Sequence, residues 1–249
     1  MLSVEKLQVS YDGFVAVFSA SLKISAGQIV SLIGANGAGK SSLLSAAAGL
    51  LKPGGGRVLF DGEEITGLTA DQIVPKGLGM VPQGGRCFQR MSVEDNLLVG
   101  SYPKGARAHR ARSLERVYTL FPMLKEKRRD PAGTLSGGQR QMVAIGRALM
   151  AEPKCLIFDE ISLGLAPVVI QDLYATIGEI NREQGTAVIL VEQDTNRALR
   201  MSDYSYIMQG GRIALEGRTD ELTPKAIREA YFGITERAAA GSAAEAVSP

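Results

Sequence analysis

The sequence has no tryptophan, one histidine and only two cysteines among its 249 residues. The two cysteines, Cys87 and Cys155, cannot build the disulfide framework of a small secreted domain, so nothing here requires an oxidising compartment. No apolar run approaches the roughly 18 residues that a membrane-spanning helix needs. The first residues lack the basic segment and apolar core of a signal peptide. We therefore expect a soluble, cytosolic chain that serves a membrane only through partners.

The sequence also has little net charge, because 28 Lys and Arg stand against 26 Asp and Glu. This balance argues against a protein that binds nucleic acid mainly through a basic surface. Apolar residues make up 45% and charged residues 22%, as in ordinary globular proteins, which excludes a chain disordered throughout. Glycine is abundant at 29 residues, which predicts tight turns and backbone that approaches another group closely.

Strand-like and helix-like patterns alternate along most of the chain. Alternating apolar residues on both sides of Asp12-Gly13 predict a β-hairpin. Short apolar runs at 28–33, 154–158 and 186–191 predict buried strands, with helices between them. This alternation predicts an α/β fold with a mostly parallel sheet. A helical pattern at about 93–151 predicts an insertion between the strands.

The segment GANGAGKS at residues 34–41 fits the phosphate-loop pattern G-x-x-x-x-G-K-[ST], with a predicted strand before it and a predicted helix after it. Its backbone N–H groups and the helix N-terminus would bind phosphate. Lys40 would reach the β- and γ-phosphates, and the Ser41 hydroxyl would coordinate Mg²⁺. This context disfavours a glycine-rich turn with a chance lysine. The predicted ATP-binding residues are Gly34, Ala35, Asn36, Gly37, Ala38, Gly39, Lys40, Ser41 and Ser42.

Two carboxylates follow the predicted strand that ends at Phe158. Asp159 would hold Mg²⁺, and Glu160 would polarise a water for attack on the γ-phosphate. Many strands end in acidic residues, so this pair indicates a nucleotide site only because the same chain contains a phosphate loop. The LSGGQ at residues 135–139 predicts a second anion site at a helix start.

The phosphate loop, LSGGQ and the apolar run ending in Asp-Glu, in this order, resemble the ATP-binding subunit of ABC transporters over roughly residues 2–235. This resemblance implies a P-loop NTPase (ABC ATPase) core with an antiparallel β subdomain and an inserted helical subdomain. In that family the LSGGQ of one subunit closes on ATP that the other subunit's phosphate loop holds. The resemblance therefore implies four residues that bind ATP in trans: Ser136, Gly137, Gly138 and Gln139.

Further roles follow from the resemblance alone. Gln83 falls in the family's Q-loop, where it would touch Mg²⁺ and the attacking water. Tyr11 lies where the family stacks an aromatic ring on adenine, although a core tyrosine at a hairpin end is a serious alternative. Gln193 stands where the family usually has a γ-phosphate-contacting histidine, and the lone His109 is expected on the surface. The implied catalytic residues are Lys40, Gln83, Glu160 and Gln193, and the implied metal ligands are Ser41, Gln83 and Asp159.

Two departures from the family pattern narrow the resemblance. Ile161 and Ala166 replace the usual Pro and Asp after the carboxylates, and Gln193 replaces the histidine. The segments SLGLAP at 162–167 and VEQ at 191–193 resemble one of the two ATPase subunits of branched-chain amino-acid importers, although Ile161 in place of Pro is unusual even there. Urea and amide importers use closely similar subunits, so the solute follows from resemblance only.

The resemblance implies an ATP-binding domain at 2–236, with a helical subdomain at about 86–151, and a flexible tail at 237–249. Its expected cofactors are ATP and Mg²⁺. Its expected partners are membrane permeases, a second ATP-binding subunit and, indirectly, a periplasmic or extracellular solute-binding protein, with no nucleic acid. It would lie peripherally on the inner face of the cell membrane. The rival readings are a soluble ABC-type ATPase acting on DNA or ribosomes and a small-molecule kinase.

Overall fold

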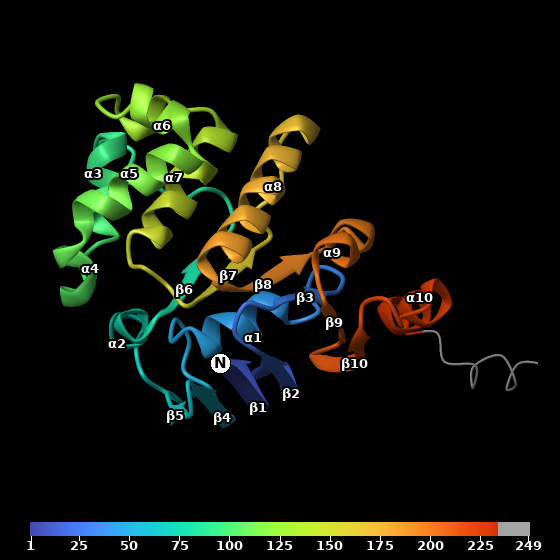
Figure 1. The fold of residues 1–249 in the computed structure, drawn as a ribbon. Coiled ribbons are helices and arrows are strands. Elements are labelled where there is room, and N and C mark those ends of the chain that lie inside the picture. The colour runs from blue at the N-terminus through green and yellow to red at the C-terminus, as the bar shows by residue number, and fades with distance from the viewer. Residues whose placement is uncertain (234–249) are drawn as a thin grey trace, which may run out of the picture.

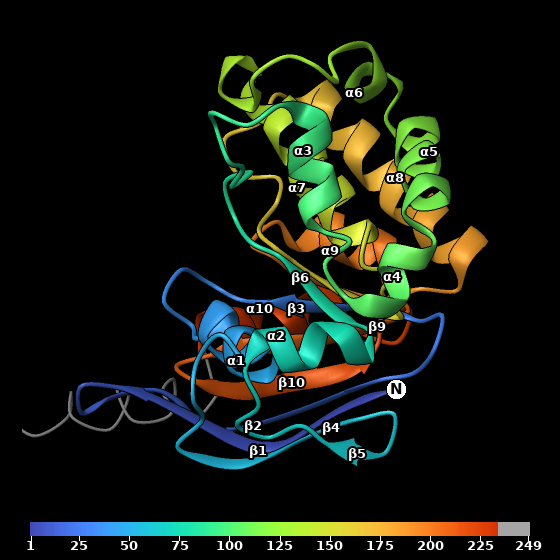
Figure 2. The same ribbon diagram turned by 90° about the vertical axis from the view of Figure 1, so that its left-hand side faces the viewer.

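A computed structural model describes residues 1–233 of the chain. The predicted flexible tail at 237–249 therefore lies outside the described residues. Figure 2 shows the described part as layers, with a block of helices on one side of the strands and a second group of strands on the other.

The central sheet has six strands in the order β10-β9-β3-β8-β7-β6. Neighbouring strands are parallel except for the β9–β10 hairpin. Every residue of β3, β7 and β8 is buried, which explains their continuous apolar runs, since a parallel sheet is covered on both faces. The predicted, mostly parallel sheet is confirmed. Its strands are β3 (Ile29–Ile33), β6 (Leu78–Val81), β7 (Cys155–Asp159), β8 (Ala187–Glu192), β9 (Tyr204–Gln209) and β10 (Arg212–Arg218).

An antiparallel sheet in the order β2-β1-β4-β5 forms the second group of strands. The predicted hairpin is present, and its turn has positive φ at Asp12 (43°) and Gly13 (88°), which suits the twist of the strands it joins. Helix α1 (Lys40–Ala47) packs between the two sheets, where Leu43 and Leu44 are fully buried. The strands are β1 (Leu2–Tyr11), β2 (Phe14–Ile24), β4 (Gly55–Phe60) and β5 (Glu63–Glu64).

The inserted helical subdomain lies between β6 and β7 in sequence (Figure 1). Helix α8 (Pro167–Gln184) lies beside its last helix, and a buried cluster joins α3, α5, α7 and α8 to one face of β7 and β8. The insertion therefore shares a core with the central sheet. Its helices are α3 (Val93–Val99), α4 (Lys104–Ala108), α5 (Arg110–Leu120), α6 (Pro122–Glu126) and α7 (Gly137–Leu149), with a 3₁₀ turn at Ala132–Thr134.

The remaining helices are short. They are α2 (Ala70–Ile73), followed by a 3₁₀ turn at Val74–Lys76, then α9 (Thr195–Met201) and α10 (Pro224–Phe232). Within residues 1–233, no helix combines the length and apolar character needed to cross a membrane.

Candidate nucleotide-binding site

The loop between β3 and α1 depends on glycine at two positions. A Cβ at Gly34 would lie 2.3 Å from the backbone oxygen of Met208, and one at Gly39 would lie 2.6 Å from that of Ala16. Gly39, with φ of 101°, also caps α1 in a left-handed conformation. Any side chain at either position would push the loop away from the sheet. The sequence pattern thus reflects a backbone path that only glycine allows.

A cavity of about 270 Å³ opens on this loop. Four separate segments of the chain line the cavity. Three polar residues predicted from the sequence outside the loop, Gln83, Glu160 and Gln193, are among the lining residues. Gly34 and Ala35 do not line the cavity, but their backbone oxygens accept hydrogen bonds from Lys40. The exposed Leu163 lines the cavity although no sequence pattern indicated it. The lining residues are Asn36, Gly37, Ala38, Gly39, Lys40, Ser41, Ser42, Gln83, Glu160, Leu163 and Gln193.

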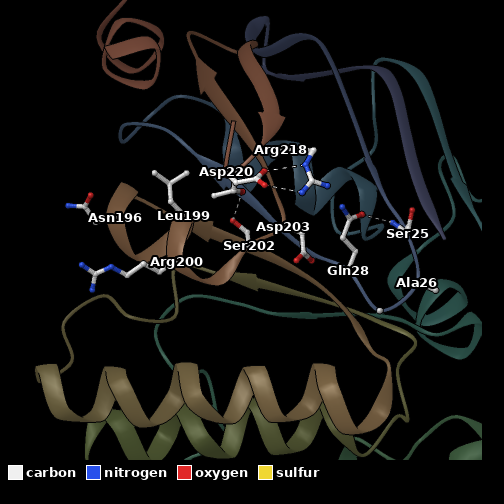
Figure 3. Close-up of a pocket in the computed structure, with 12 residues that line it drawn as sticks. Ser25, Ala26, Gln28, Asn196, Leu199, Arg200, Ser202, Asp203, Arg218 and Asp220 are labelled. Carbon is white, nitrogen blue, oxygen red and sulfur yellow. Dashed lines mark hydrogen bonds and ion pairs between the residues drawn. The ribbon is translucent and has the colours of Figure 1, made fainter. Parts of the chain in front are cut away.

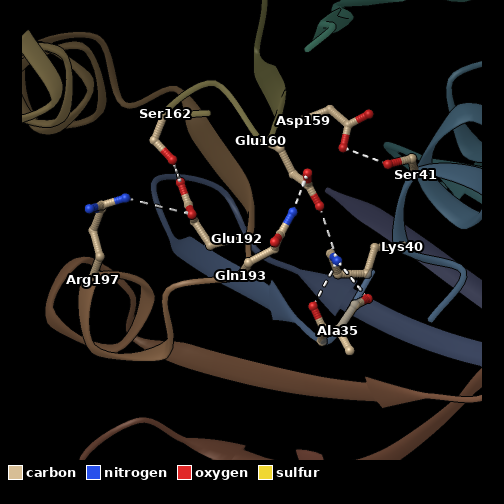
Figure 4. A network of polar contacts seen from close by, with 10 residues as sticks. Ala35, Lys40, Ser41, Asp159, Glu160, Ser162, Glu192, Gln193 and Arg197 are labelled. Carbon is tan, nitrogen blue, oxygen red and sulfur yellow. Dashed lines mark hydrogen bonds and ion pairs between the residues drawn. The ribbon is translucent and has the colours of Figure 1, made fainter. Parts of the chain in front are cut away.

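Lys40 is the most enclosed charge in the cavity, with 4% of its surface exposed. Its Nζ donates to the backbone oxygens of Gly34 (2.8 Å) and Ala35 (3.1 Å). It also forms an ion pair with Glu160 Oε1 at 3.1 Å (Figure 4). The ammonium is therefore fixed at the mouth of the loop, where it could bind an anion that enters the cavity.

Ser41 and Asp159 present two oxygen ligands side by side. The Ser41 hydroxyl donates to Asp159 Oδ1 at 2.8 Å. Burial raises the pKa of the Asp159 carboxyl; the bond from Ser41 opposes this shift, and the nearby Glu160 charge adds to it. Mg²⁺ prefers oxygen ligands and usually takes one or two carboxylates with waters and substrate phosphates. The donor set fits that ion, and among the described residues there is no cluster of three His, Cys, Asp or Glu for another metal.

Glu160 and Gln193 meet over the cavity. Gln193 Nε2 donates to Glu160 Oε2 at 2.7 Å. Glu160 has φ of 47°, so the chain turns sharply at the end of β7. This left-handed turn, rather than the alternation of an extended strand, aims the Glu160 carboxylate at the loop. Its Oε1 pairs with Lys40 and its Oε2 with Gln193, so both oxygens are occupied.

Gln83 and Tyr11 lie at the edge of this arrangement. Gln83 is half-buried and lines the cavity just after β6. Tyr11 is 42% exposed at the end of β1, and its hydroxyl donates to the Ser42 hydroxyl at 3.1 Å. The Tyr11 ring therefore lies near the loop and outside the core, so the alternative of a core tyrosine is wrong. Its stacking on adenine stays a prediction.

The LSGGQ segment lies in the helical subdomain. Ser136 caps α7, where its Oγ accepts from the Gln139 N–H at 3.3 Å and the Gln139 side chain accepts from the Ser136 N–H at 3.0 Å. A Cβ at Gly138 would lie 2.6 Å from Val169 Cγ1. Within the described chain, none of residues 136–139 lines the phosphate-loop cavity. His109 is on the surface beside Glu152, as expected.

A larger hollow of about 880 Å³ lies elsewhere (Figure 3). It is bounded by the loop at residues 25–28, by α9 and by the turn after β10, where Arg218 pairs with Asp220 at 3.0 Å. None of the predicted site residues lines it. The predicted chemistry is therefore associated with the smaller cavity.

A phosphate loop between a parallel strand and a helix, with its serine bonded to a carboxylate on another strand of the same sheet, defines a P-loop nucleoside triphosphatase. Residues 17–162 match the ABC transporter family, and the chain belongs to it. It is a nucleotide-binding ATPase of that family. ATP-binding subunits of ABC transporters dimerise and work with membrane permeases.

Relatives and solved structures agree with this assignment. The chain is 43% identical to the high-affinity branched-chain amino acid transport ATP-binding protein BraG of Pseudomonas aeruginosa, over 94% of this chain and 100% of that protein. It is 33% identical to the probable branched-chain amino acid transport ATP-binding protein LivF of Archaeoglobus fulgidus, over 89% and 94%. A nucleotide-free ATP-binding cassette from an ABC transporter superposes with a TM-score of 0.80 at 27% identity, over 95% and 96%. The ADP conformation of MJ1267, another such cassette, gives 0.79 at 29% identity, over 94% and 99%.

Proposed function

We propose that this chain is an ATP-binding and hydrolysing subunit of an importer for branched-chain amino acids, bound peripherally to permeases on the inner face of the cell membrane. The observation that carries the proposal is the similarity over the whole of BraG, together with a cavity on the phosphate loop. Two such subunits close on ATP and reopen after hydrolysis. The second subunit is a non-identical ATPase, and a periplasmic or extracellular protein delivers the solute.

Six polar side chains in or beside the cavity have a part in this reaction. Lys40 and the loop N–H groups hold the β- and γ-phosphates, and Ser41, Asp159 and Gln83 hold Mg²⁺, which would offset phosphate charge. Glu160 orients the attacking water and accepts its proton, and Gln193 donates to the γ-phosphate. The 2.7 Å contact between Glu160 and Gln193 supports a shared position for water and phosphate beside both side chains.

The second anion site supports a composite arrangement. Ser136, Gly137, Gly138 and Gln139 open α7, a helix of 13 residues, and the structure places them outside the cavity of their own chain. A helix N-terminus carries a partial positive charge and N–H groups that suit phosphate. We infer that these four residues complete the cavity of the partner ATPase rather than their own.

The helical subdomain offers a surface for the permease. A hollow of about 370 Å³ lies between the segment after Gln83, α3 and α7, with Phe88 (50%), Val99 (40%) and Tyr102 (41%) exposed around it. Such an apolar rim beside the Gln83 segment would let an apolar helix of the permease act on the nucleotide site. A cysteine introduced at Val99 should form a crosslink to the permease in membranes, whereas one at the exposed Glu63 on the antiparallel sheet should not.

Solute uptake tests the proposal. In cells from which this gene is deleted, uptake of labelled leucine should be lost, and the wild-type gene should restore it while Lys40→Ala should not. Uptake of labelled urea serves as the matched alternative, because urea importers use similar subunits. If the deletion abolishes urea uptake and leaves leucine uptake intact, the assigned solute is wrong, although the assigned ATPase is not.

A further inference from the structure

Glu192 is a buried carboxylate that the roles above do not use. It is the last residue of β8, and only 3% of its surface is exposed. Its Oε1 accepts from the Ser162 hydroxyl at 2.9 Å and from the Tyr174 hydroxyl of α8. Its Oε2 lies 3.9 Å from Arg197 of α9, whose guanidinium stacks over the Tyr174 ring at 5.6 Å. Burying a carboxylate is costly unless it is bonded in this way.

These contacts tie together the two segments that carry the hydrolytic pair. Ser162 follows Glu160 by two residues, and Glu192 directly precedes Gln193. The Ser162–Glu192 bond and the Glu160–Gln193 bond therefore join the same two segments twice (Figure 4). Two short bonds between two segments fix their separation and their orientation, whereas one bond leaves a hinge. A side-chain network in a dry environment is stiffer than its separate members.

We propose that Glu192 is a positioning residue for ATP hydrolysis. By holding Ser162, it keeps the turn at Glu160 in register with the end of β8, so that Gln193 meets the Glu160 carboxylate. Tyr174 and Arg197 fix the Glu192 side chain from α8 and α9 and complete its bonds. The inference rests on the proposed roles of Glu160 and Gln193 and adds a group that acts on them from outside the cavity.

The sharpest test removes one bond and leaves the carboxylate satisfied by its other partners. Ser162→Ala should lower kcat of the assembled transporter's ATPase on the order of fivefold, the effect of one hydrogen bond of about 1 kcal/mol. KM and ATP affinity should stay as in the wild type, because the phosphate loop is untouched, and any fall in melting temperature should be no larger than that of a variant that loses a similar bond elsewhere in the chain. Ser162→Thr keeps the hydroxyl and should restore kcat.

The chain contains a matched control. Ser113 in α5 also donates to a glutamate, Glu152, at 2.9 Å, but in the helical subdomain and away from the cavity. Ser113→Ala removes the same type of bond and should leave kcat unchanged. If Ser113→Ala and Ser162→Ala lower kcat equally, the effect is general softening, and the positioning role is wrong.

Coupling to Gln193 separates this inference from the proposed function. In a Gln193→Ala background, Ser162→Ala should change kcat by less than about twofold, since the bond that it positions is already gone. A full fivefold loss in that background would overturn the inference. If Gln193→Ala alone leaves kcat at the wild-type value, the proposed role of Gln193 fails. If it lowers kcat while Ser162→Ala does not, only the positioning role fails.

Discussion

The ammonium of Lys40 lies 3.1 Å from the carboxylate of Glu160, so the cation assigned to the phosphates and the base assigned to water bind one another. Both side chains are nearly buried, with 3% and 11% of their surface exposed. The pairing lowers the cost of burying the two charges. We expect an entering phosphate to compete with Glu160 for Lys40, which would free the Glu160 carboxylate to turn toward water. Nucleotide binding would therefore also release the base.

Removing the cation should affect both binding and stability. Lys40→Ala should weaken ATP binding strongly and abolish turnover, because the charge facing the β- and γ-phosphates is lost. It should also destabilise the nucleotide-free chain by about 3 kcal/mol, since Glu160 stays buried without its partner. Nucleotide titration and chemical denaturation measure the two effects.

The Lys76–Glu63 pair provides the control for stability. It is as short, at 2.6 Å, but its side chains are 37% and 68% exposed. Lys76→Ala should cost much less stability than Lys40→Ala, because solvent screens an exposed ion pair, and it should leave nucleotide binding intact. Equal losses for Lys40→Ala and Lys76→Ala would show that burial of the Lys40–Glu160 pair has no energetic consequence.

The composite arrangement predicts a separation of binding from turnover. Ser136→Arg places a bulky cation at the start of α7, outside the cavity of its own chain. The purified chain should bind ATP as well as the wild type. The assembled transporter should lose most of the turnover at the site that this helix completes. Impaired ATP binding by the isolated Ser136→Arg chain would contradict the arrangement in trans.

Stability should depend on pH through Glu192. Burial raises the pKa of the Glu192 carboxyl above the ordinary value of 4.5. The bond from Ser162 and the positive charge of Arg197 oppose this shift. The Asp194 carboxylate lies 3.2 Å from Arg197 and shares that cation. Between the ordinary and the raised pKa, the folded chain holds a proton that the unfolded chain releases, so stability falls as pH rises. The variant Glu192→Gln lacks this loss. Its free energy of unfolding, relative to the wild type, should therefore improve as pH rises from about 4.5, as denaturation at several pH values measures.

Glu152 provides a control in which stability should change with pH in the opposite direction. Partial burial opposes its ionisation, but the bonds from His109 and Ser113 prevail and lower the pKa of its carboxyl. Its stabilising contribution is present above the ordinary pKa and is lost as pH falls. Glu152→Gln should thus lose stability relative to the wild type as pH rises from the lowered pKa to the ordinary pKa of about 4.5, with no further change above it. The same sign of slope for both variants would contradict the assigned shifts.

Much of the fold could be predicted from the sequence because its signals are local. Buried strands such as Cys155–Asp159 are continuous apolar runs, and the hairpin at Asp12-Gly13 follows from turn chemistry. Strand β6 (Leu78–Val81) escaped prediction, since it has only four residues and one is glycine. That glycine lets β6 lie against β7, where a Cβ would be 3.0 Å from Leu156 Cδ2. The advantage of glycine there depends on a residue far along the chain.

The candidate site likewise has one part that the sequence predicts and one part that only the fold shows. The phosphate loop at residues 34–41 is a contiguous pattern, so the sequence alone predicts it. The meeting of Glu160 with Gln193 depends on a left-handed turn and on two neighbouring strands, which no contiguous pattern encodes. Glu192 looked like one more strand residue. Only the fold shows that Ser162, Tyr174 and Arg197 converge on it.

The central claim is that Glu160 is the base of one hydrolytic site and that Gln193 assists it. Glu160→Gln keeps the size and hydrogen bonding of the side chain but removes the proton acceptor. It should lower turnover on the order of 10²–10⁴-fold while ATP binding persists, so the closed, ATP-bound dimer accumulates. Gln193→Ala should cost less, because a neutral amide donates a weaker bond than a charged group. Gln193→His, which restores the usual family residue, should be the mildest.

The most direct measurement is the steady-state ATPase rate of the assembled transporter carrying each of these three changes, with ATP binding measured in parallel. We predict the order Glu160→Gln slowest, then Gln193→Ala, then Gln193→His, with ATP binding retained in all three. A Glu160→Gln transporter that binds ATP and hydrolyses it at the wild-type rate would contradict the account, because the site described would then not be the one that performs the reaction.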